Sequence, residues 1–158
     1  MPQPPSEVSG QLSRTVAKRA LSGWVVIHLS GSAPGELERV AAAYRPLGIN
    51  AYVEPFLPDM GLAWSAATLA ICRAGAGTVA EAWASQTPSI FLPYPHHKDQ
   101  HQRHNAEPLV RAGGALLAED HVDPVATVGG LLGRIAELLS NQARRAAMQA
   151  CLQRTQPP

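Results

Sequence analysis

Apolar and polar residues form alternating blocks that predict strands and helices in turn along the chain. Short apolar or β-rich runs are followed by turn residues and then by segments with helical spacing. The predicted strands cover residues 24–30, 51–54, 68–72, 89–92 and 115–118. The predicted helices cover residues 11–21, 35–44, 58–65, 77–85, 99–112, 123–139 and 141–153. Strands that alternate with helices across short connections predict an α/β fold with a doubly wound, mostly parallel sheet.

Two local patterns refine this picture. The run 68–72 (TLAIC) lacks alternation, which is typical of a strand buried on both faces of a parallel sheet. The pair Gly113 and Gly114 closes the helix predicted over 99–112. The proline-rich residues 1–10 predict a disordered start, so we expect residues 11–158 to form a single domain.

Composition excludes several classes of function. The net charge is +1, from 13 basic and 12 acidic residues, so a nucleic-acid partner is not expected. No apolar run approaches the roughly 20 residues of a membrane-spanning helix, so no transmembrane segment is predicted. Two cysteines, Cys72 and Cys151, are too few for a disulfide framework. Cys72 lies in an apolar strand, and we interpret it as a core residue of a protein kept in a reducing compartment.

A glycine loop joins the strand at 68–72 to the helix at 77–85. Its residues, Gly75-Ala76-Gly77-Thr78, turn several backbone N–H groups toward one point, where the helix macrodipole adds positive potential. This place suits an anion, and a diphosphate fits it best. Glu81 follows one turn later, where a carboxylate can accept hydrogen bonds from a ribose diol.

A purely structural interpretation of the same residues stays open. The segment Thr78-Val79-Ala80-Glu81 has the spacing of a capping box. In that arrangement the threonine hydroxyl and the glutamate carboxylate satisfy backbone N–H groups of the helix without any ligand. The residues alone do not decide between the cap and the ligand site.

A second polar segment, 93–105, follows the strand at 89–92. Gln102 and Asn105 are three residues apart, on one face of the predicted helix and toward the same sheet edge. Their amides have the chemistry to recognise sugar hydroxyls.

The histidines of this segment also raise the alternative of a metal site. Lys98 and Arg103 stand among them and would repel a cation, so a solvated polar helix start is favoured and no metal is expected. The histidines considered as metal ligands are His97, His101 and His104.

His28, on an apolar strand, is interpreted as a hydrogen-bonded interior residue.

Three motifs together carry a resemblance to a known family. They are RAGAGTVAE (73–81), HKDQHQRHNA (97–106) and AGGALL (112–117), and the likeness extends upstream through EPFLPDM (54–60) and VIHLSG (26–31). The chain resembles the C-terminal domain of family 28 glycosyltransferases. Within that family it is most similar to the MurG-type enzymes, which add N-acetylglucosamine to lipid-linked muramoyl-pentapeptide in cell-wall peptidoglycan synthesis. The resemblance implies a Rossmann-like sheet, the C-terminal half of a GT-B fold.

The resemblance also implies a UDP-N-acetylglucosamine donor site and no cofactor. It places Glu81 on the ribose hydroxyls and the main chain of Leu57 on the uracil edge. Gln102 and Asn105 match amides that contact the sugar hydroxyls, and His101 is a neighbouring candidate for a sugar contact. The loop and helix start whose backbone faces the diphosphate and sugar comprise Gly75, Ala76, Gly77, Thr78 and Val79.

The family pattern contains parts that we do not find in this sequence. These are the first strand of the domain with its GGSQG-like loop, and the N-terminal acceptor domain that supplies a candidate general base. We therefore expect a donor-binding half domain, either a fragment or a natural truncation, with no evident catalytic residue and negligible transferase activity alone. The implied reaction is inverting hexosyl transfer by a cytoplasmic protein, peripheral at the inner face of the plasma membrane.

Two alternatives remain beside this interpretation. The chain could be the donor-binding subunit of a two-chain glycosyltransferase that a separate membrane protein completes with the lipid-linked acceptor. It could also be a non-catalytic module that kept the fold and lost the ligand. The sugar rests on resemblance alone, because amides such as Gln102 do not distinguish N-acetylglucosamine from other hexoses by type.

Overall fold

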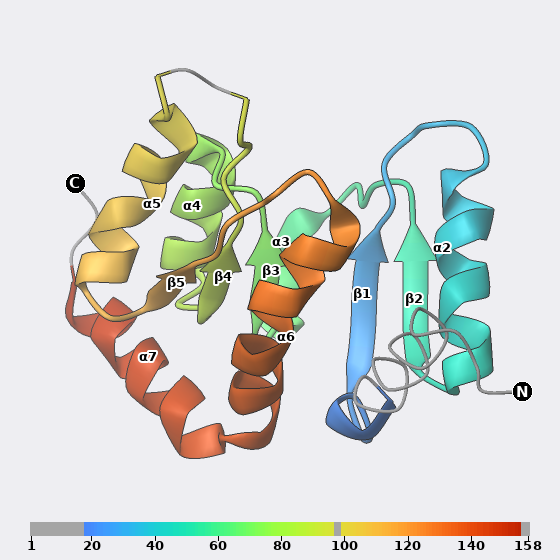
Figure 1. Cartoon of the computed structure of the whole chain (residues 1–158). Coiled ribbons are helices and arrows are strands. Elements are labelled where there is room, and N and C mark those ends of the chain that lie inside the picture. Colours follow the sequence, from blue (N-terminus) through green and yellow to red (C-terminus); the bar gives the residue numbers. More distant parts are fainter. Residues whose placement is uncertain (1–17, 97–98, 156–158) are drawn as a thin grey trace, which may run out of the picture. The chain divides into compact units, whose positions relative to one another are not determined.

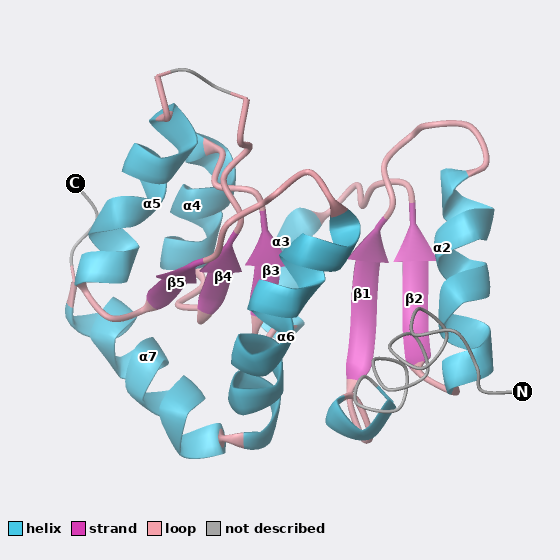
Figure 2. Ribbon diagram, viewed as in Figure 1, coloured by secondary structure: helices cyan, strands magenta, loops and turns pink. Residues whose placement is uncertain are grey.

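A computed structural model of the chain describes residues 18–96 and 99–155. The chain divides into two compact units, Met1–Met60 and Gly61–Pro158, which are described one at a time. The disordered start predicted for residues 1–10, and the first part of the helix predicted over 11–21, lie outside the described residues. Every strand is parallel to its neighbour, and helices connect the strands as predicted (Figures 1 and 2).

The first unit is a parallel strand, helix and strand arrangement. Its elements are β1 (Val25–Leu29), α2 (Glu36–Tyr44), the short 3-10 helix η1 (Arg45–Leu47) and β2 (Asn50–Glu54). Val25 pairs with Asn50 and the register continues to the ends of both strands. Along β1, residues alternate between exposed and half-buried, since one face of the strand pair packs on α2.

His28 lies on the covered face of β1, as a hydrogen-bonded residue. Its Nδ1 is 2.8 Å from the hydroxyl of Tyr44 on α2. Partial burial lowers the pKa of His28 below its ordinary value of 6.5, because the charged imidazolium loses solvation there. The interpretation of His28 as a hydrogen-bonded residue is confirmed, and the bond ties α2 to the strand.

The second unit contains a three-stranded parallel sheet in the order β3, β4, β5. These strands are Ala70–Cys72, Ser89–Phe91 and Ala115–Leu117. The helices are α3 (Met60–Ala66), which begins at the boundary of the units, α4 (Ala76–Ala84), α5 (His101–Arg111), α6 (Pro124–Ser140) and α7 (Gln142–Arg154).

The burial of the strands corrects one prediction. The segment 68–72 was expected to be buried on both faces, but Thr68 is exposed and Ile71 is 46% exposed. Within the second unit, β3 pairs with β4 and stands at one end of the three-stranded sheet, so fewer neighbours cover it than cover β4. The central strand β4 is the one buried throughout, with Ile90 and Phe91 fully inaccessible.

Local sequence signals explain where the helices begin and end. Asp123 caps α6, since its carboxylate accepts from the backbone N–H groups of Val125 and Ala126 at 3.2 and 3.3 Å. Asn141 caps α7 in the same way, accepting from the N–H of Arg144 at 2.9 Å. Gly113, at φ 81°, closes α5 as predicted.

The interior of the second unit lies between the sheet and its last two helices. It is centred on Ile90 of β4 and includes residues of α6 and α7. The other buried members of this cluster are Ala118, Leu131, Leu138 and Met148. This packing fixes the sheet, and with it the loops at the carboxyl ends of the strands, where the candidate site lies.

Candidate functional site

The glycine loop after β3 leads into α4 with its first N–H groups exposed. Gly75 is the N-cap residue, and the first intrahelical bond runs from the N–H of Val79 to the carbonyl of Gly75 at 2.9 Å. No side chain caps this helix within the described residues. The N–H groups of Ala76, Gly77 and Thr78 precede that bond, so they are available to an anion. Open space surrounds Gly77, where a Cβ would meet nothing within 4 Å.

The capping-box alternative for Thr78 and Glu81 is wrong. A box would require Thr78 at the N-cap, but α4 begins at Ala76, so Thr78 is already in the first helical turn. The Glu81 carboxylate faces a different partner. Its Oε2 accepts from the indole Nε1 of Trp64 at 2.9 Å. Glu81 is therefore held by a residue of another helix, α3, and it does not act as a capping residue of α4.

Trp64 is a residue that the sequence did not single out. It lies on α3 and is only 9% exposed, so its N–H group needs an acceptor within the protein. Glu81 supplies that acceptor with one oxygen, while the residue as a whole remains exposed. The pairing leaves the second carboxylate oxygen of Glu81 for a ligand.

The amides of α5 lie beside the glycine loop, but each has a protein partner as well. Asn105 donates through Nδ2 to the carbonyl of Ala74 at 3.1 Å, directly before Gly75. Gln102 accepts through Oε1 from the backbone N–H of Tyr94 at 2.9 Å. These bonds leave Oδ1 of Asn105 to accept and Nε2 of Gln102 to donate. The structure thus brings α5 to the loop, as the spacing predicted.

The predicted site residues that remain are His101 and Leu57, and the histidines considered as metal ligands are taken with them. The Nδ1 of His101 is 2.9 Å from Oδ1 of Asp99, and both side chains are largely exposed. Leu57 belongs to the first unit, so its role at the uracil edge stays a prediction. Residues 18–96 and 99–155 contain no group of three or more metal-binding side chains, and His97 lies outside them.

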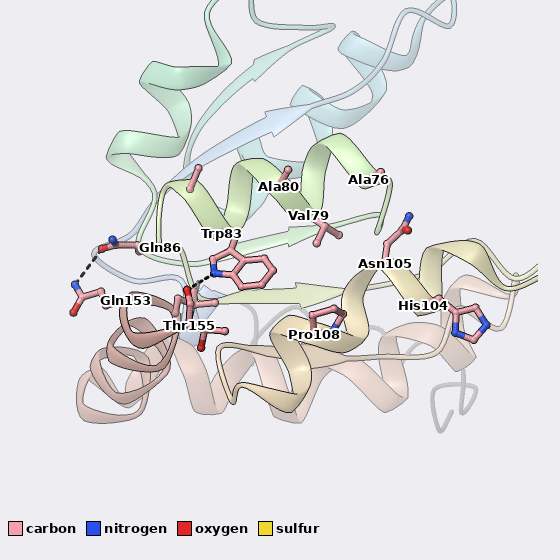
Figure 3. Close-up of a pocket in the computed structure, with 12 residues that line it drawn as sticks. Ala76, Val79, Ala80, Trp83, Gln86, His104, Asn105, Pro108, Gln153 and Thr155 are labelled. Carbon is pink, nitrogen blue, oxygen red and sulfur yellow. Dashed lines mark hydrogen bonds between the residues drawn. The ribbon is translucent and has the colours of Figure 1, made fainter. Parts of the chain in front are cut away.

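A groove of about 710 Å³ runs between α4, α5 and the end of α7 (Figure 3). Ala76 and Asn105 line one part of it, next to the glycine loop, and Figure 3 shows Thr155 and Gln153 at the other. Trp83 also lines the groove, and its Nε1 donates to the carbonyl of Thr155 at 3.0 Å. The groove therefore reaches the start of α4, where Ala76 lines it.

Cys72, at the end of β3, is expected to resist alkylation in the native protein. Burial raises the pKa of its thiol to about 12, and the negative charge of Glu81 adds to the effect. At pH 8 the thiolate fraction, and hence the rate with iodoacetamide, should fall by about a thousandfold relative to an ordinary cysteine. Peptide mass spectrometry after a timed reaction measures this, with urea-unfolded protein as the control. Equal labelling of Cys72 in both states would contradict the burial described.

Parallel strands joined by helices, with an open helix N-terminus at their carboxyl edge, define a Rossmann-like domain. The chain belongs to glycosyltransferase family 28, because residues 9–157 match the sequence profile of the C-terminal domain of that family. The predicted family and fold class are confirmed. MurG from Acinetobacter baumannii has the same fold, with a TM-score of 0.71 at 28% identity over 91% of this chain and 42% of that one.

Two sequence relatives carry the name UDP-N-acetylglucosamine–N-acetylmuramyl-(pentapeptide) pyrophosphoryl-undecaprenol N-acetylglucosamine transferase. The protein from Xylella fastidiosa is 47% identical over 106 residues, which are 67% of this chain and 29% of the relative. That from Pseudomonas putida is 40% identical over 137 residues, 84% of this chain and 36% of the relative. The chain thus spans about a third of the length of these relatives.

None of the helices within residues 18–96 and 99–155 is long and apolar enough to cross a membrane.

Proposed function

We propose that this chain binds the donor in an inverting hexosyltransferase that uses UDP-N-acetylglucosamine. The observation that carries the proposal is the uncapped start of α4, with its first N–H groups open, beside the Glu81 carboxylate. A diphosphate suits the N–H groups, and a ribose diol suits the free carboxylate oxygen. The names of the relatives support this donor and suggest peptidoglycan lipid-intermediate synthesis as the process.

In this proposal each predicted site residue has a role. The backbone from Gly75 to Val79 binds the diphosphate and sugar, and Gln102 donates through Nε2 to a sugar hydroxyl. Asn105 holds the glycine loop through Ala74 and offers only its Oδ1 to the sugar. His101 is a further candidate for a sugar contact, and the main chain of Leu57 is proposed to bind uracil.

The proposed chemistry needs an acceptor-binding domain outside residues 1–158. An acceptor hydroxyl attacks the anomeric carbon, the bond to the diphosphate breaks, and UDP leaves. The open N–H groups of α4 stabilise the charge that develops on the diphosphate. The acceptor domain supplies the lipid-linked acceptor and the general base, so the isolated chain is proposed to be inactive. Such an enzyme would act on the cytoplasmic side, peripheral to the plasma membrane.

Ligand titration tests the proposal directly. The purified chain is expected to bind UDP and UDP-N-acetylglucosamine, and to bind AMP at least about tenfold more weakly, since a uridine site discriminates by hydrogen bonds to the base. Calorimetry or amide NMR measures all three affinities. Equal affinity for AMP would contradict the donor site, and absence of binding to all three would favour a non-catalytic module.

A further inference from the structure

Arg73 lies where the three strands of the second unit end. It is the first residue after β3, and its Nη1 donates to the carbonyl of Leu92, directly after β4, at 3.0 Å. The same nitrogen is 2.6 Å from Oδ2 of Asp120, which lies in the segment after β5. One guanidinium group therefore ties together the segments that leave all three strands.

Asp120 is held firmly on its other side. Its Oδ1 accepts from the backbone N–H of Val122 at 2.8 Å and from the hydroxyl of Thr127 at 3.4 Å. The Asp120 side chain is 13% exposed, whereas that of Arg73 is 50% exposed. The carboxylate is thus a fixed point, against which the arginine is anchored.

The guanidinium also reaches the loop that leads to α5. It lies over the ring of Tyr94, with 5.6 Å between the guanidinium carbon and the ring centroid. The backbone N–H of Tyr94 donates to Oε1 of Gln102. A chain of contacts therefore runs from Asp120 through Arg73 and Tyr94 to the amide of Gln102. Along the chain, Arg73 directly precedes Ala74, whose carbonyl accepts from Asn105.

We propose that Arg73 is a positioning residue. It fixes the glycine loop and the segment around Tyr94, which leads to α5, in the relative positions that bind one sugar diphosphate. This proposal rests on the proposed function. The charge of Arg73 is matched by Asp120, and its Nη1 is shared between Asp120 and the carbonyl of Leu92. In this proposal Arg73 acts on the donor site through the two loops that it holds. A lysine keeps the charge but lacks the planar fork that joins several partners.

The test compares Arg73→Lys and Arg73→Met with the wild-type chain. Arg111→Met is the matched control, because Arg111 is exposed on α5 and pairs with Glu107 of the same helix. Asp120→Asn provides a second route, since it weakens the anchor and leaves the arginine in place. The first measurement is amide hydrogen exchange of the ligand-free protein, with the amides of β4 and α7 reporting on the global fold.

Both Arg73 variants and Asp120→Asn are expected to speed exchange of the Tyr94 amide by at least about tenfold, with β4 and α7 unchanged. Affinity for UDP-N-acetylglucosamine should fall by roughly tenfold in the same variants, because a misplacement of about 1 Å is costly at such a site. Arg111→Met should match the wild type. Unchanged Tyr94 exchange in Arg73→Met would overturn the proposal, and so would full binding by Arg73→Lys, which would show that charge alone suffices. If the wild type binds no uridine compound, the proposed function fails, while the exchange data still decide whether Arg73 holds the loop.

Discussion

Glu81→Gln is expected to lower the affinity of this chain for UDP by about tenfold while leaving its melting temperature nearly unchanged. A hydrogen bond to a charged group contributes about 1.5–3 kcal/mol, and 1.4 kcal/mol corresponds to a factor of ten in affinity. Glutamine has nearly the same shape and keeps an oxygen for the indole N–H of Trp64, so the contact inside the protein survives. What is lost is the carboxylate that the proposal assigns to the ribose.

Titration calorimetry with UDP, together with thermal unfolding of the same samples, measures both quantities. Glu137→Gln is the matched control, because Glu137 is an exposed glutamate on α6. Binding of UDP by Glu81→Gln at wild-type affinity would exclude Glu81 from the ribose. Glu81→Ala is the less informative variant, since it also leaves a buried indole N–H without its acceptor, which costs about 1–3 kcal/mol of stability.

The same titration with UDP tests whether Trp64 orients the Glu81 carboxylate. Trp64→Phe keeps an aromatic ring in a site that is 9% exposed and removes the N–H that orients Glu81. If orientation of the carboxylate matters, UDP affinity should fall by less than in Glu81→Gln but measurably. An unchanged affinity would show that Glu81 needs no partner to reach the ribose.

The sequence predicted the elements of this fold well because their ends carry local chemical signals. Gly113 needs a positive φ to end α5, and Asp123 and Asn141 have the side chains that cap α6 and α7. Such signals act over a few residues, so they are readable without tertiary structure. The capping box at Thr78 was misleading for a related reason. The same residue spacing also fits a helix that starts earlier, and only the backbone around Gly75 decides between the two.

The site itself depends on contacts between residues far apart in the chain. Glu81 meets Trp64 across 17 positions and Asn105 meets Ala74 across 31. Periodicity places these side chains on helix faces, but it does not give the register of one helix against another. The same limit explains β3, where an apolar run predicted full burial and the missing information was its position at one end of the three-stranded sheet.

Gly114→Ala is expected to destabilise the protein by about 1–3 kcal/mol, the usual cost of overpacking a core. Gly114 is buried between α5 and β5, and a Cβ there would overlap the side chain of Leu152 on α7. Leu152 is only 2% exposed, so it has little room to move away. Either α7 shifts outward or the leucine leaves its rotamer, and both weaken the interior of the second unit.

Chemical denaturation of the variant against Gly133→Ala separates this clash from the general effect of replacing a glycine. Gly133 lies inside α6 and its Cβ would meet nothing within 4 Å, so alanine there should stabilise the protein by about 0.5–1 kcal/mol. Opposite signs at the two glycines are therefore expected. Leu152→Ala alone should cost about 2–5 kcal/mol, as large-to-small core substitutions do. Combined with Gly114→Ala, it should cost clearly less than the sum, because the added methyl group then occupies space the leucine has left. Strict additivity of the two would show that Gly114 does not pack against Leu152.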